Sequence, residues 1–206
     1  MENKYGMYLA YLFQTFIGLN CLYAFITGNL AGFFSALIMF VVTLIPFFVA
    51  CRMNISFPWF VYFLIALALW FHTAGYIQGY YELYYPYYDK IAHLVSGITV
   101  ALLGFIGVMF LDQYWKMTLT TPFIVGFTII FGMALGAFWE IYEFLVDTFL
   151  GGSLAGPMQN SLNDTMLDMM FVLAGSVIVA IMGVFYFRKN HKDGTARSIN
   201  TDNEME

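Results

Sequence analysis

The chain has 206 residues, of which 61% are hydrophobic and 20% aromatic, while only 10% are charged. This composition is typical of an integral membrane protein and excludes an ordinary soluble domain. The formal net charge is −5, and no basic patch of the kind that binds nucleic acid is present.

Six apolar stretches are each about 20 residues long, the length that an α-helix needs to cross the hydrocarbon core of a bilayer. In chain order they cover residues 7–27, 30–50, 57–77, 91–110, 123–145 and 165–187. Long apolar runs, in place of short alternating segments, exclude a transmembrane β-barrel. We therefore predict an all-α fold, a polytopic bundle of six transmembrane helices in a domain that covers residues 1–187. The polar residues 188–206 are expected to form a disordered cytoplasmic tail.

The distribution of basic residues predicts the orientation in the membrane. Positively charged loops stay on the cytoplasmic side, and with the N-terminus inside only Lys90 of the eight Lys and Arg residues falls outside. Both termini are then cytoplasmic. The first stretch lacks a small-residue cleavage site, so we expect it to be a retained helix and not a signal peptide.

A tyrosine-rich segment, residues 80–88, separates the third and fourth stretches. Tyrosine rings favour the membrane interface, so the segment is predicted to form an aromatic belt, with a lip over a substrate site as the alternative. Pro86 is expected to break the segment before the next helix begins.

Ionisable residues lie near the ends of the last three stretches, all on the predicted outer face. Each such residue costs about 2.5 to 3.5 kcal/mol inside a bilayer, which indicates a function for them. Helical periodicity places the members from one helix on a shared face, one turn apart. We therefore predict a single site formed by Asp89, His93, Glu140, Glu143, Asp147, Asp164 and Asp168.

So many carboxylates require compensation by protons or by a bound cation. Carboxylates with one imidazole suit Zn, Mn or Fe, whereas carboxylates alone suit Mg or Ca. We expect a divalent metal ion to be held by His93, Glu140, Glu143 and Asp168. Asp89 or Asp164 would serve as the catalytic base.

Less specific interpretations remain open for several of these residues. The acidic side chains could cap helix ends and bind interfacial water, and Asp89 could be a simple N-cap. Lys90 is expected to extend to the interface, with a headgroup or phosphate contact as the alternative. His72, in the third stretch, is more often a hydrogen-bonded residue than a site member. Gly132 and Gly136 form a G-x-x-x-G step that predicts close helix packing, with a homodimer as the weaker option.

Three motifs carry a resemblance to a known family. They are a D-x-x-x-H element in Tyr88–His93, an E-x-x-E element in Trp139–Glu143 and a D-x-x-x-D element in Asn163–Met169. In this order, from about Tyr85 to Gly175, they resemble the YjdF-type family of uncharacterised bacterial inner-membrane proteins. The resemblance implies a multi-pass protein of the bacterial cytoplasmic membrane. A looser similarity to VanZ-like proteins implies a link to the cell envelope, although the arginine expected between the VanZ-like acidic elements has no clear counterpart here.

The leading functional hypothesis is a metal-dependent hydrolase in the membrane that acts on a lipid or lipid-linked envelope substrate. An ion- or proton-coupled transporter is the alternative from another class, and a structural subunit of an envelope complex is a third. Transporters commonly contain internal repeats with sites at the bilayer midplane. The first three stretches have no acidic counterpart of the last three, which favours the enzyme.

Overall fold

A computed structural model describes residues 4–150, 159 and 161–203, with the side chains of residues 4–149, 159 and 161–187. The elements in this part of the chain are helices: α1 (Lys4–Ile26), α2 (Leu30–Met53), α3 (Trp59–Ile77), α4 (Tyr80–Leu83), α5 (Tyr87–Trp115), α6 (Thr121–Leu150) and α7 (Leu162–Asn203). Six of the described helices, all but the short α4, are long and apolar enough to cross a membrane. The predicted all-α polytopic bundle is therefore confirmed.

The helices differ most from the predicted stretches where charged residues begin or end them. α5 begins at Tyr87 instead of residue 91, and α6 continues to Leu150 instead of residue 145. A prediction from hydropathy ends an apolar stretch where charged residues begin. In the structure these charged side chains are largely buried inside the bundle, so the helices extend past the predicted bounds. The backbone of α7 is helical to Asn203, past Phe187 where the sequence predicts a disordered tail. The division of the chain at residue 187 stays a prediction.

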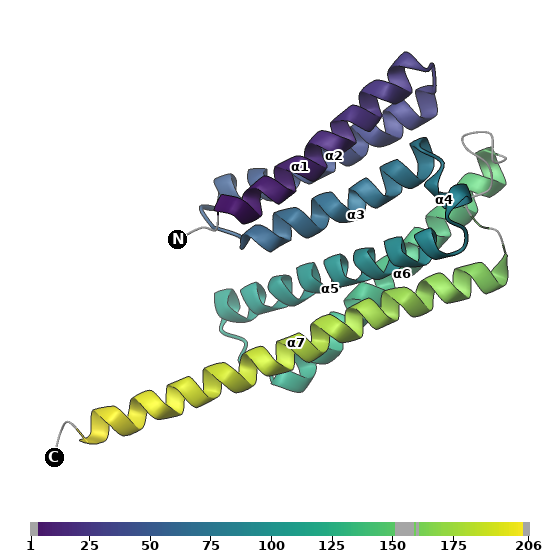
Figure 1. Cartoon of the computed structure of the whole chain (residues 1–206). Helices are drawn as coiled ribbons and strands as arrows, with labels where there is room; N and C mark the ends of the chain where they lie inside the picture. Colours follow the sequence, from purple (N-terminus) through teal and green to yellow (C-terminus); the bar gives the residue numbers. More distant parts are fainter. Residues whose placement is uncertain (1–3, 151–158, 160, 204–206) are drawn as a thin grey trace.

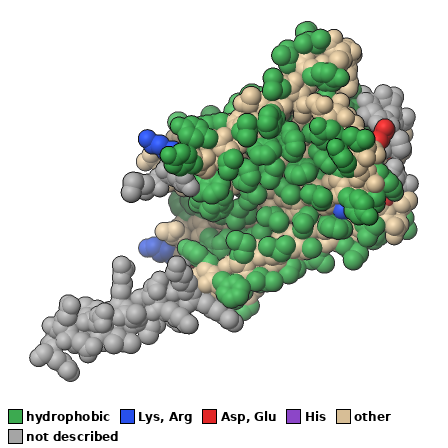
Figure 2. All heavy atoms as spheres, viewed as in Figure 1, with side chains coloured by type: hydrophobic (Ala, Val, Ile, Leu, Met, Phe, Trp, Pro, Cys, Tyr) green, Lys and Arg blue, Asp and Glu red, His purple; other side chains and the backbone are tan. Residues whose placement is uncertain are grey.

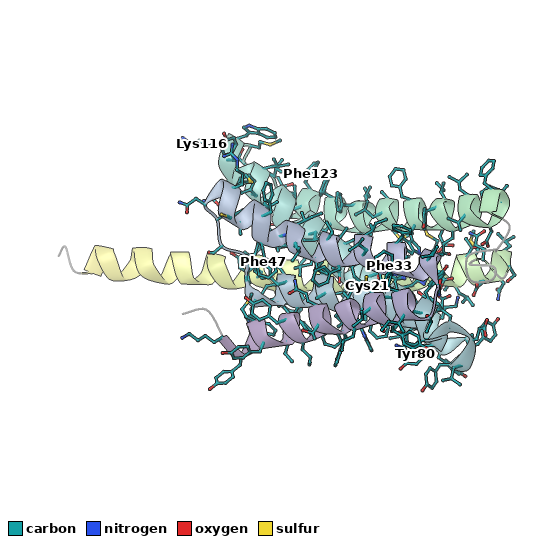
Figure 3. The ribbon with its side chains drawn as sticks, turned by 90° about the horizontal axis from the view of Figure 1, so that it is seen from above. Cys21, Phe33, Phe47, Tyr80, Lys116 and Phe123 are labelled. Atoms are coloured by element: carbon teal, nitrogen blue, oxygen red, sulfur yellow. The ribbon has the colours of Figure 1, made fainter. Side chains whose placement is uncertain are left out.

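The long helices form two groups of three, α1–α3 and α5–α7 (Figure 1). In the described part of the chain, α3 and α5 make the closest backbone contacts between the groups, and α4 lies at their connection. Both termini lie at one end of the bundle, here named the terminal end, and α4 lies at the other, the α4 end (Figure 1). Viewed from above, Lys116 lies at the terminal end and Tyr80 at the α4 end (Figure 3).

Two hydrogen bonds between α5 and α3 join the groups. The Tyr88 hydroxyl donates to the carbonyl of Phe71 at 3.0 Å, and the Thr99 hydroxyl donates to the carbonyl of Leu64 at 3.3 Å. Hydrogen bonds between membrane helices contribute about 0.6 to 2 kcal/mol each. Because the two bonds are eleven residues apart on α5, they fix its register against α3 at two heights.

Glycines allow α5, α6 and α7 to approach closely. A Cβ atom at Gly97 of α5 would lie 2.8 Å from the Cα of Val172 in α7, and one at Gly136 of α6 would lie 2.8 Å from a Val172 side-chain carbon. Gly132 faces Ser176, one turn further along α7. The G-x-x-x-G step thus packs helices closely within one chain, as predicted. Homodimerisation stays a prediction, and this buried step is not a surface available for it.

The outer surface has the polarity of a protein embedded in lipid. Hydrophobic side chains cover the face between the two ends, and charged side chains show only near the ends: Lys and Arg at the terminal end, and Asp and Glu together with a Lys or Arg at the α4 end (Figure 2). Large apolar side chains are exposed along the long helices, among them Ile38, Phe48, Ile130, Phe138 and Met182. In a soluble protein such continuous exposure would be unusual, and here it provides the contact with the bilayer.

Candidate functional site

Ionisable side chains from three helices meet inside the bundle at the α4 end. We call them the polar cluster: Asp89, Lys90 and His93 of α5, Glu140, Glu143 and Asp147 of α6, and Asp164 and Asp168 of α7. All except Asp89 and Asp147 are at most 7% exposed. Acidic residues that only cap helix ends in interfacial water would be more exposed than these. The structure thus brings the sequence-predicted residues to one end of the bundle, while their roles stay predictions.

Lys90 lies among three carboxylates. Its ammonium donates to the two carboxylate oxygens of Asp168 at 2.8 and 2.9 Å, to Asp89 Oδ2 at 3.1 Å, and to Asp164 Oδ1. The expectation that Lys90 extends to the interface is therefore wrong. A buried ammonium is stable when carboxylates pair with it, and here α7 supplies two of them.

His93 contacts two of the same carboxylates, Asp89 and Asp168. Its Nδ1 atom lies 3.2 Å from Asp89 Oδ1, 3.1 Å from Asp168 Oδ1 and 3.0 Å from the carbonyl oxygen of Asp89. Each of these three residues offers one potential ligand atom, and the three atoms lie within 4.8 Å of one another. Asp168 therefore links the Lys90 contacts to the imidazole.

Two buried atoms facing each other are without hydrogen bonds. His93 Nε2 lies 3.4 Å from Glu140 Oε1, and neither atom has a hydrogen-bond partner in the described part of the structure. The other carboxylate oxygen of Glu140 is 3.3 Å from Gln159 Nε2, which donates to it. The two atoms are within ion-pair distance of each other, and a buried polar atom without a hydrogen bond is uncommon in native proteins.

Glu143 and Asp147 are held by other partners. Trp139 Nε1 donates to Glu143 Oε1 at 2.7 Å, and the backbone nitrogen of Gln159 donates to Asp147 Oδ2 at 2.8 Å. Glu143, a predicted metal ligand, thus lies outside the group of three that could share an ion. Neither Trp139 nor Gln159 is among the residues that the sequence predicts for the site. The one-turn spacing of Trp139 and Glu143 was the available signal.

His72 of α3 borders the polar cluster without entering it. Its Nδ1 lies 2.8 Å from the Tyr81 hydroxyl and its Nε2 lies 3.3 Å from the Ser96 hydroxyl. Its ring packs against Trp139 at an angle of 40°, with centroids 4.6 Å apart. Burial, together with the charge of Asp89, raises the pKa of Tyr81 well above its usual value. The Tyr81 hydroxyl therefore stays protonated and can donate a hydrogen bond to His72 Nδ1.

A cavity of about 440 Å³ begins beside His93 and runs between the two helix groups. Its polar lining comes from His72, His93, Ser96 and Thr99. Its other walls are mainly apolar and come mostly from α2, α3, α5 and α6, among them Val42, Ile45, Val61, Leu69, Val100 and Leu135, with Val172 from α7. The volume is within the usual range for pockets that hold small molecules.

A family model described as predicted membrane protein (DUF2238) matches residues 8–189 of the chain. No curated protein and no solved structure matches it. The matched range contains the whole polar cluster, and it confirms the resemblance to the YjdF-type family.

Proposed function

We propose, for a chain that belongs to the DUF2238 family of predicted membrane proteins, that the polar cluster is the site of a metal-dependent hydrolase. The substrate would be a lipid or a lipid-linked precursor of the cell envelope. The observation that carries the proposal is the group of ligand atoms from Asp89, His93 and Asp168 within 4.8 Å of one another. Two carboxylates and an imidazole are suitable ligands for Zn, Mn or Fe.

The neighbouring residues support a division of roles. Asp89, His93 and Asp168 would hold the metal ion, which supplies Lewis acidity and a bound water of low pKa. Glu140 Oε1 lies 3.4 Å from His93 Nε2 without a hydrogen bond, and Glu140 would be the general base beside the metal ion. Asp164 pairs with Lys90 and balances its charge. This assignment exchanges the sequence-predicted roles of Asp89 and Glu140 and leaves out Glu143.

The position of the polar cluster supports a substrate from the outer leaflet. Lys4, Arg52 and Lys116 lie at or near helix ends at the terminal end of the bundle, which the positive-inside rule assigns to the cytoplasm. The α4 end would then face the outside of the bacterial cytoplasmic membrane. The looser similarity to VanZ-like proteins also favours a substrate from the cell envelope.

A proton-coupled carrier is the second candidate. A continuous series of ionisable groups favours it, since Asp168 contacts both Lys90 and His93, and His93 lies beside Glu140. However, beyond Ser96 and Thr99 the walls of the adjoining cavity are apolar. Such walls suit a hydrocarbon chain better than an ion, so the enzyme is the better-supported proposal.

The test is elemental analysis of metal in the detergent-purified full chain, prepared without chelator and after addition of zinc or manganese. Wild type should contain a stoichiometric amount of metal, and Asp168→Asn and His93→Gln should each lose it. Glu82→Gln, which alters an exposed carboxylate in α4, is the matched control and should retain the metal. A metal-free wild type, or equal metal in Asp168→Asn and Glu82→Gln, would overturn the proposal.

A further inference from the structure

The cavity beside the polar cluster has the dimensions of one hydrocarbon chain. Along α5 its lining extends from His93 to Leu103, a rise of about 15 Å at 1.5 Å per residue. This length is about half of the 30 Å hydrocarbon core, which is the depth of one leaflet. Beyond Ser96 and Thr99 the apolar walls offer water few hydrogen-bond partners, and leaving this part empty would forfeit the contacts of its walls.

The cavity also opens sideways to the bilayer. Ile45, Leu103 and Leu135 line it, and they are 51%, 36% and 36% exposed. They come from α2, α5 and α6, and these helices belong to groups that contact each other through α3 and α5. A lipid chain can therefore enter between α2 and α6 without leaving the apolar phase.

The two ends of the cavity differ in a way that orients such a chain. At one end are His93 and the contact of His72 Nε2 with the Ser96 hydroxyl, and beyond it the walls become apolar. We propose that the cavity binds one hydrocarbon chain of an amphiphilic lipid, with its polar linkage at His72 and Ser96 and its headgroup in the polar cluster. The proposal assigns an amphiphilic lipid as the substrate class of the proposed enzyme. It rests on the proposed function only for the reaction at the headgroup, and binding of the chain does not depend on that function.

A lipid chain matches the cavity better than a helix from a second copy of the protein does. The polar lining lies mainly at one end, and the other walls are apolar along a rise of about 15 Å on α5, which is the division of an amphiphilic lipid into polar linkage and hydrocarbon chain.

Photolabelling of the full-length protein in detergent tests the inference. The probe is a long-chain lysophospholipid with a diazirine in its acyl chain, and labelled peptides are identified by mass spectrometry. We expect labels on the cavity walls of α2, α3 and α5. Val42→Phe places a ring in the cavity and displaces about two methylenes of the chain, so half-saturation of labelling should require about ten times more probe. Val100→Phe, in α5, should raise the required probe concentration in the same way. Agreement between the two variants would show that the effect does not come from a local disturbance of α2.

Val41→Phe is the matched control, because Val41 is adjacent on α2, is 53% exposed and lies outside the cavity lining. It should label like wild type. Equal labelling of Val42→Phe and Val41→Phe, or labels confined to bilayer-facing residues, would overturn the inference. So would a dimer in native mass spectra that Val42→Phe dissociates, since a second copy would then be the occupant.

The same labelling in Asp168→Asn separates this inference from the proposed function. Asp168 does not line the cavity, so chain binding should persist in a variant that has lost the metal site. If wild type lacks metal but labels as expected, the hydrolase proposal fails and the chain site stands. If wild type holds metal but Val42→Phe changes nothing, the chain site fails alone.

Discussion

The ammonium of Lys90 in α5 lies 2.8 and 2.9 Å from the two carboxylate oxygens of Asp168 in α7. Both side chains are buried. Asp168 also contacts the imidazole of His93, so a single carboxylate connects the lysine to the proposed metal site. The pair therefore links the stability of the helix bundle to the geometry of the site.

Replacing Lys90 with Met should destabilise the protein strongly. The change leaves the carboxylates of Asp89, Asp164 and Asp168 without their shared cation, and breaking a buried pair costs about 3 to 5 kcal/mol. Thermal unfolding in mild detergent measures the loss. Lys116→Met, at an exposed position at the end of α5, is the control. Adding Asp168→Asn to Lys90→Met should restore part of the stability, and the idea fails if Lys90→Met unfolds like wild type.

Gly97→Ala should force α5 and α7 apart. The added Cβ atom would lie 2.8 Å from the backbone of Val172, and such overpacking costs about 1 to 3 kcal/mol. Gly107→Ala in the same helix is the matched control, because a Cβ atom there meets nothing within 4 Å. Denaturation in mixed micelles should show a loss for Gly97→Ala alone. Equal stability of the two variants would mean that the close approach of the helices is not required.

Trp139→Phe should show the value of the indole donor. Phenylalanine keeps an aromatic ring against His72 but removes the Nε1 group that donates to Glu143, leaving a buried oxygen unpaired at a cost of about 1 to 3 kcal/mol. Glu143→Gln retains an acceptor oxygen and should cost less in the same unfolding measurement. If Glu143→Gln is as destabilising as Trp139→Phe, charge and not the hydrogen bond governs this contact.

Stability at alkaline pH should depend on Tyr81. Because its pKa is raised in the folded state, its contribution is complete below its ordinary pKa of about 10 and is lost as the pH rises through the folded value. Melting temperatures measured against pH should therefore fall more steeply for wild type than for Tyr81→Phe. Tyr84→Phe, at a 54% exposed position next to α4, should behave like wild type. Parallel curves for wild type and Tyr81→Phe would contradict the role of this hydroxyl.

Residue spacing predicted the parts of the site that lie on one helix, and tertiary packing determined the rest. The pairing of Asp89 with His93 follows from their separation by one turn, and the six spans follow from hydropathy. The inward direction of Lys90 depends on carboxylates that α7 supplies 74 and 78 residues later, so no local pattern could reveal it. The cavity was equally unpredictable, because its walls come from helices of both groups.

The separation of Lys90 from its partners along the chain has a consequence for biogenesis. Synthesis proceeds from the N-terminus, so α5 is inserted before α7 has been made. Until α7 follows, Lys90 has Asp89 of its own helix as a partner but lacks Asp164 and Asp168. The arrival of the last helix neutralises a charge already placed in the membrane. The attraction between Lys90 and the two carboxylates of α7 thus favours placement of α7 in the position that it has in the folded bundle.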